Sequence, residues 1–465
     1  MPELPEVETI KNILAKLVIG KKISNIEIFN RNTIEGDPSD FAKTLRGKTI
    51  SKLTRIGKFL IFHLDEEIVF LSHLRMEGKY FYHEQMLETY DKHACVVFTF
   101  SDHSALEYND TRKFGLMKLS SAATYQTSPP LSNLGPEPFD IKDVKPLLSK
   151  LARKTIPIKA VLLDQTFMAG LGNIYVDEVL YLSLIHPETP ADRISESQLQ
   201  EIIENSIKVL SMAIKSGGST IRSYHPSQGI DGGFQTQLNA YGKENLPCPR
   251  CNHGMRKIFV GGRGTTFCPR CQKNPSLPYV IGITGPIGSG KSSVLSFFGE
   301  RGYLTLSGDT IVKDLYQDKK VQESIVKLFG NNVVDESGNI DKRFIVDVII
   351  ADEHKKRRLE KILHPRVEKA VVETLKKAHN DDKIAIEMPL LFEAKLDDYC
   401  DETIYVDIED SIQAKRLAER RLPLATLRAL NTGFDALRDK EKATYVVDNS
   451  SSLSKLYKQL KRILR

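Results

Sequence analysis

The sequence predicts a multidomain protein in which a β-sandwich, a helical domain with a helix-two-turn-helix unit and a zinc ribbon precede an α/β P-loop domain with a parallel sheet. The chain of 465 residues is long enough for roughly three domains at about 150 residues each. Four of its six cysteines form two Cys-x2-Cys pairs. A Gly-x4-Gly-Lys-Ser loop follows an apolar strand shortly after the second pair.

The composition excludes a membrane protein. Hydrophobic residues make up 41% and charged residues 27% of the chain, values typical of a soluble globular protein. No apolar run approaches the ~20 residues of a membrane span, and the acidic start is unlike a signal peptide. We therefore expect a cytoplasmic location and no membrane partner. The net charge of +6 is only a weak indication of a polyanionic partner.

The first predicted domain covers residues 1–133. Apolar residues recur at helical spacing from Val7 to Leu17, which predicts a helix beginning near Pro5. Short β-rich runs follow up to about residue 119, for example residues 59–64 and 94–100, and Gly and Asp interrupt them. This pattern predicts a β-sandwich or barrel.

The second predicted domain, residues 134–243, is helical. Its helical pattern is interrupted at Ala169-Gly-Leu-Gly-Asn173, so that one helix opens at Asn173. Free backbone N–H groups at such an opening favour an anion, including a DNA phosphate. An ordinary helical hairpin explains the same spacing, and both interpretations stay open at this point.

The third predicted domain, residues 244–273, is a zinc ribbon. Cys248, Cys251, Cys268 and Cys271 form two pairs that enclose 16 residues. This spacing is typical of a structural zinc site with four thiolate ligands. The glycine-rich tip between the pairs carries Arg263, which such a ribbon would present to DNA.

A short linker, residues 274–278, leads to the last predicted domain, residues 279–465. The strand, the Walker A loop and the following helix are in the order that nucleotide binding requires. The loop amides would wrap the phosphates, Lys291 would reach the β/γ oxygens, and Ser292 would hold Mg²⁺. The predicted ATP-binding residues are Gly285, Gly288, Ser289, Gly290, Lys291, Ser292 and Ser293.

The first ~273 residues resemble the bacterial formamidopyrimidine-DNA glycosylases. The resemblance rests on the opening Pro-Glu-Leu-Pro-Glu, Lys58-Phe-Leu, His73-Leu-x-Met-x-Gly78, Asp110-x-Arg-x-Phe-Gly115, Gly172-Asn-Ile-Tyr175 and the terminal Cys-Pro-Arg-Cys-Gln. It implies a glycosylase and AP lyase that removes oxidised purines, such as 8-oxoguanine and formamidopyrimidines, from double-stranded DNA. The opening favours this branch over the related endonuclease VIII, which acts on oxidised pyrimidines and is the alternative.

The resemblance also implies roles for single residues. Pro2, exposed by removal of Met1, matches the nucleophile, and Glu3 matches the general acid/base. An α-amino group titrates near ~8 and a lysine near ~10.4, so more of the proline amine is nucleophilic at neutral pH. Lys58 matches the β-elimination lysine and Arg263 the δ-elimination residue.

The implied DNA contacts fall into two groups. At phosphates or the strand opposite the lesion lie His93, Arg112 and Arg153, and in the gap left by the extruded nucleotide lie Met76, Arg112 and Phe114. Asn173, at the helix opening, is a further predicted DNA contact. Residues 216–224 resemble the loop over the damaged base. Extrusion is expected because chemistry on a base requires it to leave the stack.

Residues 279–465 resemble dephospho-CoA kinase. The resemblance rests on Ile362-Leu-His-Pro365, Pro389-Leu-Leu-Phe-Glu393 and Tyr445-Val-Val-Asp-Asn449. It implies transfer of the γ-phosphoryl group of ATP to the ribose 3′-hydroxyl of dephospho-CoA. Another acceptor, or a binding role alone, is the alternative.

Further kinase residues follow from this resemblance. Asp309 matches the acidic residue that accepts the proton or orders the acceptor. Ser307 stands where the family has a first Asp, which puts acceptor binding in doubt. His364 and Glu393 are expected at the acceptor pocket, and four lid arginines at the phosphates: Arg416, Arg420, Arg421 and Arg428.

Overall fold

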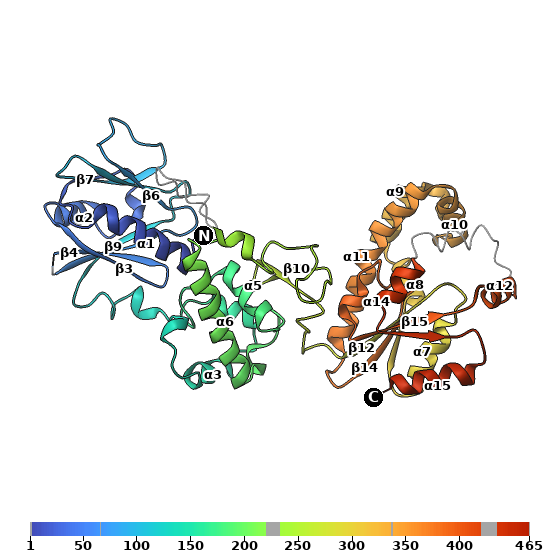
Figure 1. Cartoon of the computed structure of the whole chain (residues 1–465). Helices are drawn as coiled ribbons and strands as arrows, with labels where there is room; N and C mark the ends of the chain where they lie inside the picture. The colour runs from blue at the N-terminus through green and yellow to red at the C-terminus, as the bar shows by residue number, and fades with distance from the viewer. Residues whose placement is uncertain (1, 66, 220–232, 336–337, 420–434, 465) are drawn as a thin grey trace. The chain divides into compact units, whose positions relative to one another are not determined.

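The computed structural model describes residues 2–65, 67–219, 233–335, 338–419 and 435–464. These residues form two compact units, Met1–Asn274 and Pro275–Arg465 (Figure 1). We describe each unit separately. No helix in the described part of the chain has the length and apolarity needed to cross a membrane.

The first unit begins with two β-sheets. The four-stranded sheet has the order β1 (Ile23–Ile28), β7 (Ala94–Phe100), β8 (Ala105–Asn109), β6 (Lys79–His83). The five-stranded sheet has the order β2 (Ile34–Glu35), β9 (Leu116–Ser121), β5 (Ile68–His73), β4 (Phe59–Leu64), β3 (Ile50–Ile56). The Phe70 ring stacks on Phe62 of its own sheet at 4.3 Å and on Phe98 of the other sheet at 5.5 Å. The predicted β-sandwich is therefore confirmed.

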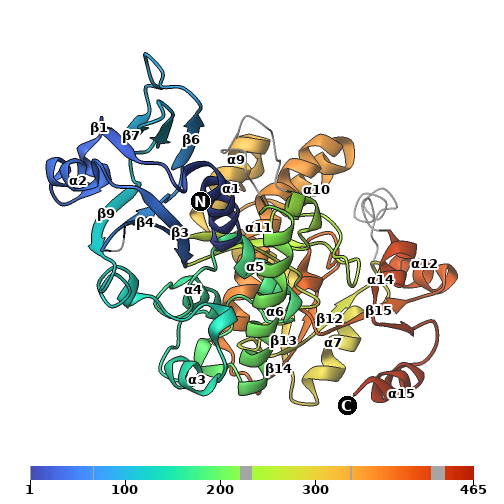
Figure 2. The same ribbon diagram turned by 60° about the vertical axis from the view of Figure 1, so that its left-hand side comes forward.

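Helix α1 (Leu4–Val18) closes the sandwich core beside β3 (Figure 2). Val7, Ile10 and Leu14 are buried on its inner face. Glu3 and Glu6 form a reciprocal capping box at its start, which satisfies two N–H groups that a helix otherwise leaves without a partner. The helix begins one residue before the predicted Pro5.

The helical part of the first unit contains α3 (Lys145–Leu151), α4 (Ile158–Leu163), α5 (Asn173–Leu182) and α6 (Glu196–Lys215). A nine-residue connection separates α4 from α5 and contains Gly170, whose φ is +100°. A Cβ at Gly170 would lie 2.5 Å from the Leu4 side chain. Glycine is therefore required for its backbone angle and for the close approach of the first residues of the chain.

The ribbon of the first unit is a hairpin of β10 (Arg256–Val260) and β11 (Arg263–Phe267). Cys248 and Cys268 are buried at its base with Met255 and Tyr181. Arg263 is the first residue of β11 and is exposed.

The second unit has one parallel sheet of five strands, as predicted. Its order is β13 (Leu304–Ser307), β14 (Lys383–Glu387), β12 (Tyr279–Thr284), β15 (Glu402–Asp407), β16 (Tyr445–Asp448). Side chains of β12 alternate between two cores: Ile281 and Ile283 face one, and Val280 faces the other. The strand before the P-loop is therefore central and buried on both faces, as parallel strands usually are.

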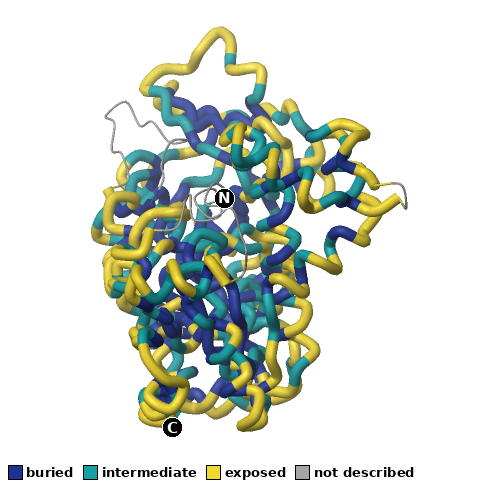
Figure 3. The backbone as a smooth tube through the Cα atoms, turned by 90° about the vertical axis from the view of Figure 1, so that its right-hand side faces the viewer, coloured by how far each residue is buried: buried dark blue, intermediate teal, exposed yellow. Residues whose placement is uncertain are grey.

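Helices cover both faces of this sheet. The described helices of this unit are α7 (Lys291–Gly299), α8 (Gly308–Leu315), α9 (Lys319–Phe329), α10 (Lys342–Ala351), α11 (Glu353–Lys377), α12 (Asp410–Glu419), α14 (Ala436–Lys442) and α15 (Leu453–Ile463). Of these, α9 and α10 do not cover the sheet but form a separate core with the first half of α11. Buried residues of α7 and α15 share one core with the sheet, and those of α8 and α11 share the other. Figure 3 marks the buried residues of both units in dark blue.

Candidate active sites

Glu3 links the start of the chain to the start of α5. Its carboxylate accepts hydrogen bonds from the backbone N–H groups of Ile174 at 3.0 Å and Tyr175 at 3.4 Å. Leu4 N donates to Gly170 O at 3.1 Å. The start of α5 therefore holds the Glu3 carboxylate. Pro2, the residue before Glu3, is half-buried.

Burial raises the pKa of the Glu3 carboxyl. The side chain is 3% exposed. Loss of solvation raises its pKa from 4.5 to about 7, against the lowering effects of Lys58 and the two N–H donors. A carboxyl with a pKa near neutrality exchanges a proton readily at physiological pH, which is what a general acid/base requires.

Lys58 lies in the same buried region. Its ammonium Nζ donates to Leu171 O at 2.7 Å, within the connection that precedes α5. Burial lowers the pKa of Lys58, and the positive charge of Arg263 lowers it further, whereas Glu3 and Glu6 oppose this change. Three of the four predicted lyase residues therefore interact electrostatically, although they come from positions 3, 58 and 263.

A buried ion pair attaches the ribbon hairpin to α5. Lys159 Nζ is 2.6 Å from Asp177 Oδ1, and both side chains are fully buried. Asp177 also accepts from Thr266 N at 2.9 Å, and Lys159 donates to Gly264 O at 3.3 Å. This pair, which the sequence analysis missed, fixes the strand that carries Arg263. A buried lysine and a buried aspartate 18 residues apart are not recognisable from the sequence.

Glu6 connects three segments and was also missed. Its Oε1 accepts from the Tyr175 hydroxyl at 2.6 Å and from Ser219 N at 2.8 Å, and its Oε2 accepts from Glu3 N at 2.9 Å. A glutamate three residues into a helix is a recognisable capping signal. The sequence does not show that the same carboxylate would reach Ser219, at the edge of the candidate base loop. The rest of that loop, residues 220–224, lies outside the described residues.

Asp110 shapes the turn that presents the candidate wedge residues. Its carboxylate accepts from the backbone N–H groups of Arg112 and Phe114, each at 2.9 Å, and of Gly115 at 2.7 Å. Arg112 is exposed, and Phe114 is 62% exposed. A large aromatic side chain held in solvent by a rigid turn suits insertion into a base stack. Met76 is half-buried.

The other candidate DNA contacts are more dispersed. His93 O accepts from Asp110 N at 3.1 Å, which places His93 beside the wedge turn. Arg153 is exposed in the turn after α3. Asn173 donates its side-chain amide to Gly264 O at 2.9 Å, so that part of this side chain supports the ribbon.

The four ribbon cysteines converge as predicted. All four Sγ atoms lie within 4.8 Å of one another, with Cys248–Cys271 at 3.9 Å and Cys251–Cys268 at 3.5 Å. A tetrahedral zinc with Zn–S bonds of about 2.3 Å requires Sγ separations of about 3.8 Å. The thiolate set and its dimensions therefore fit structural zinc.

The P-loop of the second unit connects β12 to α7. Gly285, Gly288 and Gly290 all have positive φ values, between +81° and +143°. Lys291 Nζ donates to Gly285 O at 3.0 Å and Pro286 O at 3.1 Å. The loop therefore curls around the lysine, and Ser292 and Ser293 follow in the first turn of α7.

Two segments distant in sequence support the P-loop. Asn449 Nδ2 donates to Ser289 O at 2.7 Å, and Gln413 donates to Ile287 O at 2.7 Å. Arg416, a predicted lid residue, donates to Asn449 O at 3.0 Å. Arg420, Arg421 and Arg428 lie outside the described residues.

Acidic residues gather at the carboxyl edge of the sheet. Asp309 is in the first turn of α8, directly after β13. Ser307 donates its hydroxyl to Glu387 Oε2 at 3.1 Å, and Glu387 interacts electrostatically with Lys291 and Asp309. The sequence analysis did not select Glu387, although its place at the end of the apolar run 384–386 was a usable signal.

The expected acceptor residues lie on one helix and in one loop. Glu393 forms an ion pair with Arg438 of α14, which also contacts Asp439. His364 is within α11, where burial lowers its pKa.

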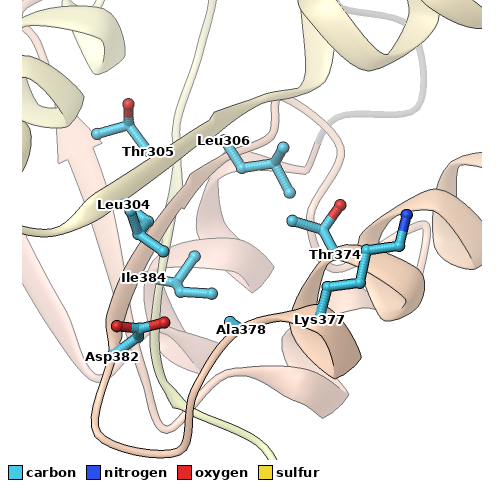
Figure 4. Close-up of a pocket in the computed structure, with 8 residues that line it drawn as sticks. All are labelled: Leu304, Thr305, Leu306, Thr374, Lys377, Ala378, Asp382 and Ile384. Carbon is cyan, nitrogen blue, oxygen red and sulfur yellow. The ribbon is translucent and has the colours of Figure 1, made fainter.

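A separate pocket of about 270 Å³ is not the nucleotide site. Figure 4 shows its lining from β13, the end of α11 and the start of β14: Leu304, Thr305, Leu306, Thr374, Lys377, Ala378, Asp382 and Ile384. The P-loop follows the carboxyl end of β12 and contributes no residue to it.

Family models match four stretches of the chain. The formamidopyrimidine-DNA glycosylase N-terminal domain matches residues 1–117, the H2TH domain of the same enzymes matches residues 134–225, and the zinc finger found in FPG and IleRS matches residues 245–274. The dephospho-CoA kinase model matches residues 279–455.

Curated formamidopyrimidine-DNA glycosylases are similar to the first unit of the chain. It is 48% identical over 273 residues to the formamidopyrimidine-DNA glycosylase of Ligilactobacillus salivarius, with 58% of this chain and 99% of that protein covered. It is 48% identical over 276 residues to that of Bacillus subtilis, with the same shares covered.

Two solved structures have a similar fold over 59% of this chain and 100% of theirs. One is a complex between Lactococcus lactis Fpg and DNA containing an abasic site, with a TM-score of 0.55 and 41% identity. The other is MutM in complex with DNA containing carbocyclic 8-oxo-G, with a TM-score of 0.55 and 42% identity.

Proposed function

The chain belongs to the formamidopyrimidine-DNA glycosylase family through residues 1–274 and carries a dephospho-CoA kinase domain at residues 279–455, and on this premise we propose that one polypeptide performs both reactions. The first unit excises oxidised purines from double-stranded DNA through a Schiff base on Pro2 and cleaves the strand. The second unit phosphorylates dephospho-CoA on its ribose 3′-hydroxyl with ATP. Both reactions take place in the cytoplasm, where DNA and ATP are present together.

The observation that carries the glycosylase proposal is the environment of Glu3. Its buried carboxyl, with a pKa raised to about 7, adjoins Pro2 and interacts electrostatically with Lys58. Hydrogen bonds to the charged form lower the pKa of a carboxyl, and at Glu3 burial outweighs them. The raised pKa supports a proton-transfer role.

The mechanism follows from these groups. The secondary amine of Pro2, freed when Met1 is removed, attacks the sugar C1′, and the bond to the damaged base breaks. The amine nitrogen then loses its proton, and the C1′–O4′ bond opens with protonation of O4′, which gives an iminium. The iminium accepts electron density when C2′ loses a proton and the 3′ C–O bond breaks by β-elimination. Glu3 transfers protons at the sugar, Lys58 acts in β-elimination, and Arg263 assists δ-elimination at the second phosphate.

Borohydride trapping tests this reaction. Reduction of the iminium should link the chain covalently to an oligonucleotide that contains 8-oxoguanine. Pro2→Gly should reduce trapping sharply, whereas Lys291→Ala, in the other unit, should leave it unchanged. Absence of an adduct in the unaltered protein would exclude the proposed chemistry.

The alternative substrate class is oxidised pyrimidines. Side-by-side trapping on 8-oxoguanine and on an oxidised pyrimidine, such as thymine glycol, separates the two classes. Preferential trapping on the pyrimidine would show that the first unit acts like endonuclease VIII.

The P-loop geometry supports the kinase proposal. The positive φ angles of Gly285, Gly288 and Gly290 curve the loop, and Lys291 lies at its centre, as phosphate binding requires. Magnesium bound with ATP would neutralise phosphate charge, and Ser292 is the P-loop residue that would hold it. Asp309, at the same edge of the sheet, would orient the acceptor hydroxyl or accept its proton.

Acceptor-dependent ATP consumption tests the kinase. Dephospho-CoA should stimulate ADP release and yield CoA, and Lys291→Ala should abolish both effects, whereas Pro2→Gly should not. ATP consumption with a different nucleotide acceptor would favour another kinase reaction. Nucleotide binding without any turnover would favour a binding role alone.

A further inference from the structure

We propose that the open edge of the parallel sheet in the second unit is a docking surface for a second copy of this chain. Strand β13 of one copy would pair antiparallel with β13 of the other, across a twofold axis at Thr305, and would join the two five-stranded sheets. The inference depends on neither proposed reaction, because the surface lies beside the pocket of Figure 4 and not at the P-loop.

Strand β13 forms one edge of its sheet. Among the described strands it pairs with β14 alone, so the backbone groups on its other side lie outside the sheet ladder. Its sequence, Leu304-Thr-Leu-Ser307, contains neither a charged residue nor a proline. Edge strands that avoid pairing with another chain usually carry such residues. The edge of β13 is therefore open to another strand.

The sheet face beside this edge is apolar. Leu304 is 53% exposed and is paired with Ile384 of β14. Leu306, two residues further on, is paired with Ile386. Paired residues share a face of the sheet, and here it is the face on which both isoleucines pack against α11. The pocket of about 270 Å³ lies on the same face, between β13 and the end of α11 (Figure 4). A strand added to β13 would cover apolar surface with every second side chain.

The charges around the pocket favour a partner surface without net charge. Of the eight residues that line it, the charged ones are Lys377 and Asp382, and their charges are opposite. DNA or a strongly charged peptide would therefore gain little attraction here, because complementary potentials are what favour a charged partner. A second copy presents the same balanced pocket and the same uncharged strand, so that no like charge is in excess.

The sequence of β13 fixes the register of the pairing. With the twofold axis perpendicular to the sheet at Thr305, this residue would lie opposite Thr305 of the second copy. Leu304 would lie opposite Leu306 of the second copy. Residues directly opposite one another share a face, so the four leucines would meet on the pocket side. The two threonines would meet on the other side, where a Thr–Thr pair is favourable.

Apolar burial must supplement the backbone pairing. A two-stranded contact is marginal in water by itself, and β13 has four residues. The removal of the Leu304 side chain from water would stabilise the contact further, because burial of apolar area is favourable. The resulting interface is isologous, which is the commonest kind in homodimers.

Sedimentation velocity of the full chain at increasing concentration tests the proposal. The unaltered protein should shift from the monomer mass toward twice that mass. Leu304→Glu should raise the dimer dissociation constant by about tenfold or more, because a charge that loses its water without a partner is costly. Leu453→Glu is the matched control. Leu453 is 54% exposed on α15 of the same unit, and its substitution should leave the dissociation constant unchanged.

A cysteine at the twofold axis tests the register. The Cα atoms of directly opposite residues lie about 4.5–5.5 Å apart in an antiparallel pair, within the range that a disulfide spans. Thr305→Cys should therefore form a covalent dimer when oxidised glutathione takes up the two electrons, and a reductant should reverse it. Thr310→Cys, also exposed but beyond the strand in α8, should form no more covalent dimer than the unaltered protein.

Three results would each overturn the proposal. The first is a monomer mass of the unaltered protein at every concentration, which would leave the edge to a peptide of another protein or to solvent. The second is an unchanged dimer in folded Leu304→Glu, which would place the interface elsewhere. The third is equal crosslinking of Thr305→Cys and Thr310→Cys, which decides the question even if Leu304→Glu does not fold.

Discussion

At the scale of single residues, burial decides the chemistry of the first unit. Glu3 is surrounded by α1, α5 and Lys58, and its pKa rises to about 7 because desolvation outweighs the favourable interactions. Burial likewise lowers the pKa of Lys58 and raises that of Asp177 to about 6. Perturbed pKa values that gather in one region are typical of active sites.

The raised Glu3 pKa predicts a pH-dependent stability. A carboxyl with a pKa of 4.5 unfolded and about 7 folded stabilises the fold fully below pH 4.5, and this contribution is lost as the pH rises through 7. The loss should amount to about 3 kcal/mol. Urea unfolding at pH 5 and pH 8 tests this prediction. The unaltered protein should lose this unfolding free energy between the two pH values, whereas Glu3→Gln should not. An equal pH dependence of the unfolding free energy in the two proteins would contradict the prediction.

The buried pair of Lys159 and Asp177 predicts a large single-variant effect. Lys159→Met leaves the Asp177 charge without its partner and should cost about 3–5 kcal/mol of unfolding free energy. The double variant Lys159→Met/Asp177→Leu should recover much of this loss, because no isolated charge remains. Denaturant unfolding of the three proteins measures the difference, and additive losses would argue against the pair.

At the scale of elements, helix starts and hairpins assemble the first site. The start of α5 binds the Glu3 carboxylate, the connection before α5 accepts the Lys58 ammonium, and the side of α5 fixes the ribbon strand through Asp177. One short helix thus positions residues from both ends of the unit.

Gly172 provides a test at this scale. A Cβ there would lie 2.3 Å from the Glu3 carboxyl carbon, so Gly172→Ala should displace the carboxylate from the α5 start. Displacement by about 1 Å can cost about a hundredfold in rate, and excision in single-turnover assays should fall accordingly. Gly254→Ala is the matched control, because a Cβ at Gly254 would meet nothing within 4 Å. Equal rates in the two variants would contradict the prediction.

At the scale of the whole molecule, two units with separate cores share one chain. The described residues of Met1–Asn274 and of Pro275–Arg465 each form their own hydrophobic clusters and their own candidate site. The boundary between the units lies between Asn274 and Pro275.

Separate cores predict separable activities. Lys291→Ala should abolish phosphoryl transfer and change the rate of lesion excision by less than about twofold. The reason is that substitutions at sites that share no contacts usually act independently. Pro2→Gly should have the converse effect. Steady-state kinetics of both reactions on each full-length variant test this, and a large loss of both activities in either variant would reveal coupling.

Local patterns predicted much of the two folds. The cysteine spacing, the Walker A loop and the alternation of strands and helices each depend on residues within a few positions of one another. The β-sandwich and the parallel sheet were recognisable because strand periodicity is also local. The convergence of Cys248 with Cys271 followed from the same short spacings.

The remaining site residues depend on contacts between distant segments. Glu6 was recognisable as a capping residue, but its contact with Ser219 spans 213 residues. Glu387 accepts a hydrogen bond from Ser307, which lies 80 residues away in sequence, because strands β13 and β14 are neighbours in the sheet. Sequence periodicity identifies strands but does not give their order in a sheet.

Neighbours along the chain specify the reactive groups of this protein: a proline amine with an adjacent carboxyl, four thiolates at ribbon spacing and a phosphate-binding loop. These groups are therefore recognisable from the amino-acid order. Packing places Glu3 at the α5 start, where burial raises its pKa to about 7, and places Glu387 between the P-loop strand and Ser307. Desolvation and charge proximity follow from packing, because packing brings together residues far apart in sequence.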